Sequence, residues 1–115
     1  MIPNEAVLLR IFIGESDKVG GLPLYEWLVT QAKAKGLAGA TVLRGIMGFG
    51  AHSKMIHTFK IERLSEDLPI VVEMVDSPEK IEEFLSFAEA NIKRGLLATT
   101  EKVKVRIYRG GEPGK

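Results

Sequence analysis

The 115-residue sequence contains no cysteine, which excludes disulfide bonds and metal sites built on thiolates. This absence is typical of proteins in the reducing cytoplasm, where we expect the chain to act. Asparagine and glutamine are also scarce. Depletion of these heat-labile residues is common in thermophiles and is a weak indication of the source.

Long apolar runs are also absent. No stretch of the sequence reaches the roughly 18 apolar residues that a membrane-spanning helix needs. The first residues include Glu5, Glu15 and Asp17, and Arg10 interrupts their apolar run. A signal peptide has instead a basic start and an uninterrupted apolar core. We therefore expect a soluble, cytoplasmic protein.

Neither sign of charge dominates. The sequence has 16 Lys and Arg residues and 15 Asp and Glu residues, which give a formal net charge of +1. A nucleic acid is therefore not an expected partner, and any anion site must be local. The length and the 45% hydrophobic content predict one domain over residues 1–115, with a flexible tail at 109–115.

Short runs of branched apolar side chains have the pattern of strands. They predict strands at residues 7–13, 40–47, 69–75 and 101–109, with a shorter candidate at 58–64 beside the second.

Two segments have helical spacing instead. Pro23 can open a helix that Gly36 ends, while Ser77 and Pro78 form a cap and first turn for a second helix that stops before Gly95. The apolar stripes are Leu24, Trp27, Leu28 and Ala32 in the first helix, and Ile81, Phe84, Leu85, Ala88 and Ile92 in the second.

This order of elements, β-α-β followed by β-α-β, predicts an α+β fold of the ferredoxin-like βαββαβ type. In that fold a four-stranded antiparallel sheet carries both helices on one face. The first strand has apolar residues on both parities, including Leu8 and Phe12 opposite Leu9 and Ile11. The second sheet face therefore needs a cover. We expect a homo-oligomer to provide it, with the edge segments or the tail folding back as the alternative.

The segment RGIMGFGAHSKMIHTFK, residues 44–60, has no carboxylate, although the whole chain is nearly charge-balanced. Its glycines Gly45, Gly48 and Gly50 match neither a dinucleotide-binding loop nor a P-loop. They can let the backbone approach a ligand closely and turn N–H groups toward an anion, with Arg44 and Lys54 nearby. The alternative is a mobile hairpin with solvated charges.

His52 and His57 are the only histidines, and their spacing matches no zinc motif, so we predict no metal site. The cluster Glu15, Ser16 and Asp17 precedes the first helix, where such residues usually act as caps. Its functional alternative is a magnesium or ribose contact.

Basic residues alternate along the last predicted strand, where they are typical of a solvated edge strand. Arg106 or Arg109 would reach a phosphate only if that strand lay beside the glycine loop of a neighbouring subunit. No serine has the context of a nucleophile, so the sequence gives no positive indication of an enzyme.

Three segments together resemble the PII-like signalling proteins, in particular the branch catalogued as domain-of-unknown-function family 190. They are IGESDKVGGLPLYEWLV, GLAGATVLRGIMGFGAHSKMIHT and LSEDLPIVVEMVDSPEKIEEFL. Gly48, Phe49 and Gly50 match the Gly-Phe-Gly step of PII proteins, and His57 and Thr58 match the His-Thr stretch after it. The glycine-rich phosphate loop between the second helix and the last strand is missing, as is the tyrosine that some PII proteins have uridylylated.

The resemblance implies a homotrimer that holds adenine nucleotides or other small effectors between subunits and regulates a partner through the loop after the second strand. Because genes of this branch often lie beside small fluoride channels, a membrane transporter or channel is an implied partner.

We predict a non-enzymatic sensor of AMP, ADP or ATP. The predicted ligand contacts are Arg44, Gly45, Gly48, Phe49, Gly50, His52, Lys54, His57 and Arg106. The alternatives are a metal-responsive trimer, similar to the copper-tolerance relatives of PII, that uses His52 and His57, and an enzyme acting on a nucleotide or small metabolite.

Overall fold

The computed structural model describes residues 2–50, 67–93 and 95–110. Its centre is a four-stranded sheet in the order β4-β5-β1-β6, in which all neighbouring strands are antiparallel. The strands are β1 (Glu5–Gly14), β4 (Thr41–Arg44), β5 (Pro69–Asp76) and β6 (Leu97–Lys104). β1 and β5 are central because they carry the longest apolar runs, and β4 and β6 are edges.

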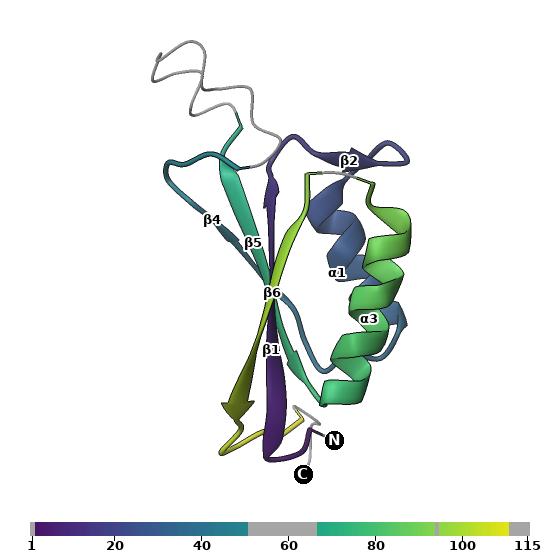
Figure 1. Ribbon diagram of the computed structural model, residues 1–115, viewed down its shortest axis with the longest axis vertical. Helices are drawn as coiled ribbons and strands as arrows, with labels where there is room; N and C mark the ends of the chain where they lie inside the picture. Colours follow the sequence, from purple (N-terminus) through teal and green to yellow (C-terminus); the bar gives the residue numbers. More distant parts are fainter. Residues whose placement is uncertain (1, 51–66, 94, 111–115) are drawn as a thin grey trace.

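Two helices, α1 (Leu24–Ala34) and α3 (Pro78–Asn91), lie on the same side of this sheet (Figure 1). The predicted ferredoxin-like α+β fold, with both helices on one face, is thus confirmed. The core lies between the layers, where every second residue of β1 and β5 meets the apolar stripes of the helices. Its most buried large side chains are Leu9, Ile11, Leu28, Val72, Met74, Ile81 and Phe84.

Local signals fix how the helices begin and end. Gly36, with a φ of 82°, follows the last turn of α1, where its N–H donates to the carbonyl of Lys33 and that of Leu37 donates to the carbonyl of Ala32. This is the Schellman pattern that a glycine after a helix permits. Ser77 caps α3, because its hydroxyl accepts a hydrogen bond from the N–H of Lys80 and Pro78 begins the helix.

The predicted cap of α1 is wrong. The residue before that helix is Pro23, which makes no side-chain cap, and an additional hairpin of β2 (Lys18–Val19) and β3 (Leu22–Pro23) separates Glu15, Ser16 and Asp17 from it. Asp17 instead contributes its backbone carbonyl, which accepts a hydrogen bond from the N–H of Leu24. Glycines at 20 and 21 with positive φ allow the tight turn of the hairpin.

Two strands also have other boundaries than predicted. The last strand runs over residues 97–104 and not 101–109, because β1 begins at Glu5, which pairs with Lys104, and offers little backbone beyond that point. β4 ends at Arg44 and not at residue 47, because the chain turns there over Pro69. The candidate strand at 58–64 and tail residues 111–115 lie outside the described part of the chain.

The face of the sheet away from the helices, here called the open face, has an apolar row next to a charged one. Opposite residues on paired strands share a face, so Leu43, Val71, Phe12 and Leu97 form a row across all four strands. Leu43 is 48% and Leu97 55% exposed. The prediction that the first strand also has apolar side chains on its second face is confirmed, since Phe12 belongs to this row.

The charged row of the open face is centred on Arg10. Its Nε lies 3.0 Å from Oε2 of Glu73, and its Nη1 lies 3.2 Å from Oε1 of Glu101. The hydrogen bond to Glu73, followed by the smaller effect of Glu101, raises the pKa of Arg10 above its ordinary value. Arg10 is thus paired with two carboxylates of neighbouring strands.

The segment after β6 covers only part of the open face. The N–H of Val105 donates to the carbonyl of Asn4, and Tyr108 and Ile2 line a hollow of about 260 Å³ together with Leu8 and Val75. This hollow lies toward the end of the sheet where β1 begins, so the described residues after β6 do not cover the apolar row near the other end.

Candidate functional site

Four strand ends meet at one end of the sheet. Gly14, at the end of β1, pairs with Pro69 at the start of β5, while Arg44 pairs with Ile70 and Leu97 pairs with Phe12. The antiparallel order thus gathers segments that are far apart in the sequence. The glycine loop after β4 starts at this same end.

The first part of the glycine loop packs on Pro69. The N–H of Gly45 donates to the Pro69 carbonyl over 2.8 Å. A Cβ at Gly45 would lie 2.8 Å from Cγ of Pro69, and one at Gly48, which has a φ of 151°, would lie 3.1 Å from the same atom. These two glycines are therefore required for close packing against the proline ring. Gly50 has no atom within 4 Å of such a Cβ and borders open space.

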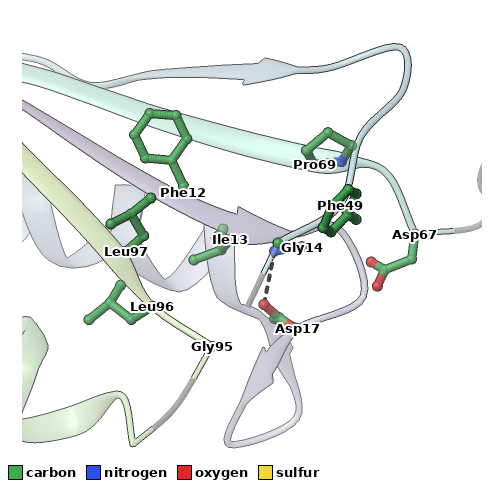
Figure 2. Close-up of a pocket in the computed structure, with 11 residues that line it drawn as sticks. Phe12, Ile13, Gly14, Asp17, Phe49, Asp67, Pro69, Gly95, Leu96 and Leu97 are labelled. Carbon is green, nitrogen blue, oxygen red and sulfur yellow. Dashed lines mark hydrogen bonds between the residues drawn. The ribbon is translucent and has the colours of Figure 1, made fainter. Parts of the chain in front are cut away.

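A cavity of about 330 Å³, here called the strand-end cavity, opens between this loop, β1 and the start of β6. Its volume lies within the range of small-molecule sites. Figure 2 shows the apolar side chains around it, with Phe49 and Pro69 on one side and Phe12, Ile13, Leu96 and Leu97 on the other. Gly14, Gly50 and Gly95 complete the lining together with two carboxylates.

The two carboxylates, Asp17 and Asp67, are held in place by the backbone of the turn after β1. Oδ2 of Asp17 accepts a hydrogen bond from the N–H of Gly14 over 2.9 Å (Figure 2). Oδ1 of Asp67 accepts one from the N–H of Ser16 over 3.0 Å. The N–H of Glu15 also donates to the carbonyl of Leu68 over 2.8 Å, which joins the two segments. The pair of acids is thus preorganised.

Arg44 does not face an empty anion site in the single chain. Its Nε lies 3.6 Å from Oε2 of Glu15, and its side chain is 60% exposed. Although the segment 44–60 has no acid of its own, the fold thus places Glu15, Asp17 and Asp67 beside its first residues. The exposed pair with Glu15 is weak and screened by solvent, so Arg44 can exchange partners.

The structure brings together five of the predicted site residues. Arg44, Gly45, Gly48, Phe49 and Gly50 lie at the end of the sheet where the strand-end cavity opens, and Phe49 and Gly50 line that cavity. His52, Lys54 and His57 lie outside the described part of the chain. Arg106 follows β6 at the opposite end of the same sheet, so one chain does not bring it to the cavity (Figure 1).

Sequence reasoning missed several residues of the cavity, above all Asp67 and the segment 95–97. Asp67 precedes an apolar strand in the sequence SEDLPIVV, and that position alone does not show which side chain it meets. The sequence favours a helix cap as the role of Asp17, whereas the structure places this residue in the lining of the cavity. Within residues 2–50, 67–93 and 95–110, no group of three or more His, Asp or Glu side chains could hold a metal ion.

Comparison with solved structures identifies the fold. The chain aligns over 91% of its length with a putative PII-like signaling protein from Thermus thermophilus and over 91% with CPII, a nitrogen regulatory PII-like protein from Thiomonas intermedia. The TM-scores are 0.62 and 0.61, the identities 21% and 13%, and the aligned shares of the solved chains 93% and 97%. The fold is therefore that of the PII-like proteins.

Sequence comparison then identifies the family. The model of the family DUF190, described as "Uncharacterized ACR, COG1993", matches residues 6–105. A UPF0166 protein of Aquifex aeolicus is 46% identical over 88% of this chain and 92% of its own length. The UPF0166 protein MJ1524 of Methanocaldococcus jannaschii is 36% identical over 92% and 94%. The chain belongs to this family, domain-of-unknown-function family 190.

No helix within the described ranges has the length and apolar character needed to cross a membrane.

Proposed function

We propose that the chain is a non-enzymatic regulatory protein that binds an adenine nucleotide, AMP, ADP or ATP, in the strand-end cavity. The observation that carries this proposal is the cavity itself, with its mostly apolar lining, its two carboxylates and a glycine-rich loop as one side. In addition, CPII, a protein of similar fold, was solved bound to ADP, AMP and bicarbonate.

The proposed regulation follows from the position of Phe49 and Gly50. Both residues line the cavity and belong to the loop that leaves β4. A bound nucleotide would contact this loop directly and favour one of its conformations, and the loop would present a different surface to a partner. The family resemblance implies a membrane transporter or channel as that partner.

We further propose that the functional unit is a homotrimer that packs open faces together. The exposed apolar row Leu43, Val71, Phe12 and Leu97 supports self-association, because such a row is unfavourable in water. Leu97 and Phe12 also line the strand-end cavity, so the interface would lie beside the ligand. In such a trimer, Arg106 of a neighbouring subunit would reach a phosphate of the bound nucleotide.

Isothermal titration of the full chain with AMP, ADP and ATP tests the ligand, and light scattering of the same samples tests the assembly. We expect micromolar binding of at least one nucleotide, near one per chain, in a particle with three times the mass of one chain. Bound nucleotide should survive for hours unchanged, since we assign no catalytic residues.

Phe49→Ala should weaken this binding about tenfold, because the ring forms one wall of the cavity. Ile46→Ala is the matched control, since Ile46 lies on the same loop, is 96% exposed and does not line the cavity. The proposed function is wrong if no adenine nucleotide binds to the intact protein. The placement of the site is wrong if the two variants bind equally well.

A further inference from the structure

The two acids in the lining of the strand-end cavity give it an unusual charge for a nucleotide site. Asp17 and Asp67 both lie beside Gly14, such that a Cβ at that glycine would be 3.5 Å from Oδ2 of Asp17 and 3.0 Å and 3.4 Å from the two carboxylate oxygens of Asp67. The absence of a side chain at Gly14 leaves room for the two acids to approach the same point. Ionised carboxylates only accept hydrogen bonds and repel other anions.

Each carboxylate is anchored through one oxygen and has a second oxygen to offer. Asp17 uses Oδ2 on the N–H of Gly14, and Asp67 uses Oδ1 on the N–H of Ser16. Within the described ranges, Oδ1 of Asp17 and Oδ2 of Asp67 have no hydrogen-bond partner. Anchoring through the backbone reduces the entropy that the acids would lose on binding a ligand.

These two acids and their apolar surroundings suit one end of a nucleotide and not the other. Phosphate groups would face like charge beside Asp17 and Asp67, whereas ribose hydroxyls can donate to a carboxylate, as they do in dinucleotide-binding proteins. The apolar side chains Phe49, Leu96 and Leu97 suit a planar base.

We infer that Asp17 and Asp67 determine ligand specificity by accepting hydrogen bonds from the ribose hydroxyls, so that the nucleoside end enters the strand-end cavity and the phosphates lie at its mouth. This inference rests on the proposed nucleotide-binding function. It assigns recognition of the nucleotide to Asp17, in the turn after β1, and to Asp67, and not to the glycines alone.

The test compares ADP with 2′,3′-dideoxy-ADP by isothermal titration of the full chain. The wild-type protein should bind ADP roughly tenfold or more tightly than the dideoxy form, because a hydrogen bond to a charged acceptor is lost with the hydroxyls. In Asp67→Asn the affinity for ADP should fall and this ratio should shrink. The asparagine oxygen can still accept from the N–H of Ser16, which preserves the turn.

Glu83→Gln is the control, since it removes the same charge from an exposed position of α3. It should leave the ratio unchanged, and equal urea midpoints for the three proteins should show that all of them are folded. This outcome supports the ribose assignment.

Two outcomes would overturn the inference and leave the proposed function standing. If wild-type protein binds both ligands equally, the acids do not recognise the ribose. If Asp67→Asn binds ADP more tightly than wild type does, a phosphate faces the acid and the ligand lies the other way round. Failure of wild-type protein to bind ADP, dideoxy-ADP, AMP or ATP removes the proposed function, and the inference with it.

Discussion

Both faces of the central sheet carry apolar side chains, but among the described residues only one face is covered by helices. On the helix-covered face, Leu9 and Val72 are completely buried. On the open face, Phe12 and Val71 are half-buried and Leu43 is 48% exposed, although all three lie in the same strands as the core residues or next to them. Two helices are enough to cover one face of a four-stranded sheet and no more.

The difference separates the surface that stabilises the single chain from the surface that would form the proposed trimer interface. Burial of the helix-covered face stabilises each chain by itself, since both layers belong to it. The open face combines an apolar row with the ionic row of Arg10, Glu73 and Glu101. In the proposed trimer the apolar row would supply contact area, and the charges would fix how the subunits align. The strand-end cavity lies where the two regions meet, because Phe12 belongs to the open face and Ile13 to the core.

The largest expected effect comes from the helix-covered face. Phe84 is 1% exposed at the centre of α3, and Phe84→Ala should lower the free energy of unfolding by about 3–5 kcal/mol, because it removes a buried ring and leaves a cavity. Urea unfolding at one fixed protein concentration measures this loss. Phe49→Ala is the matched control, since Phe49 is 68% exposed and should cost far less. Equal losses for both would contradict the proposed division between core and loop.

A substitution on the open face should change the mass of the particle in solution and not the stability of the single chain. Leu43→Asp puts a charge into the apolar row and should convert the trimer to monomers in light scattering, because an unpaired charge at an interface is costly. Leu22→Asp tests the specificity of this effect, since Leu22 has a similar exposure of 42% but lies in the β2–β3 hairpin. A wild-type monomer at micromolar concentration would end the proposal of an open-face trimer.

A smaller effect is expected where the open face meets the loop. Gly45→Ala should destabilise the protein by roughly 1–3 kcal/mol, because its Cβ would lie 2.8 Å from Cγ of Pro69 and one of the two segments must move. Gly50→Ala should be nearly neutral, as nothing lies within 4 Å of its Cβ. Urea midpoints of the two variants make the comparison, and a neutral Gly45→Ala would show that the loop does not need this contact.

The fold was largely readable from the sequence because its signals are local. The short apolar runs of β1 and β5, the glycine after α1 and the Ser77-Pro78 start of α3 act within a few residues of the chain. The β2–β3 hairpin was missed because its strands have only two residues each, too few for a periodic pattern. The Gly20-Gly21 pair was its one signal.

The candidate site was less predictable because it depends on pairing between distant segments. Gly48, Phe49 and Gly50 stand out by their spacing, but Asp67 reaches the turn after β1 only through the register of β1 with β5. The acid-free character of the segment 44–60 suggested an anion cradle. The acids that the fold places beside its first residues come from two other parts of the chain, so local composition did not predict the charge of the cavity.

The smallest expected effect concerns the start of the helix that covers the core. Ser77→Ala removes the hydroxyl that accepts from the N–H of Lys80 over 3.2 Å and should lower the free energy of unfolding by about 1 kcal/mol. Ser77→Asp should restore it, since aspartate also caps helices and its charge is favourable at a helix N-terminus. Ser86→Ala, at an exposed position within α3, should be close to neutral because alanine has the higher helix propensity. If both alanine variants have the wild-type urea midpoint, the cap does not stabilise the covered face, and packing of Ile81 and Phe84 alone must hold α3 in place.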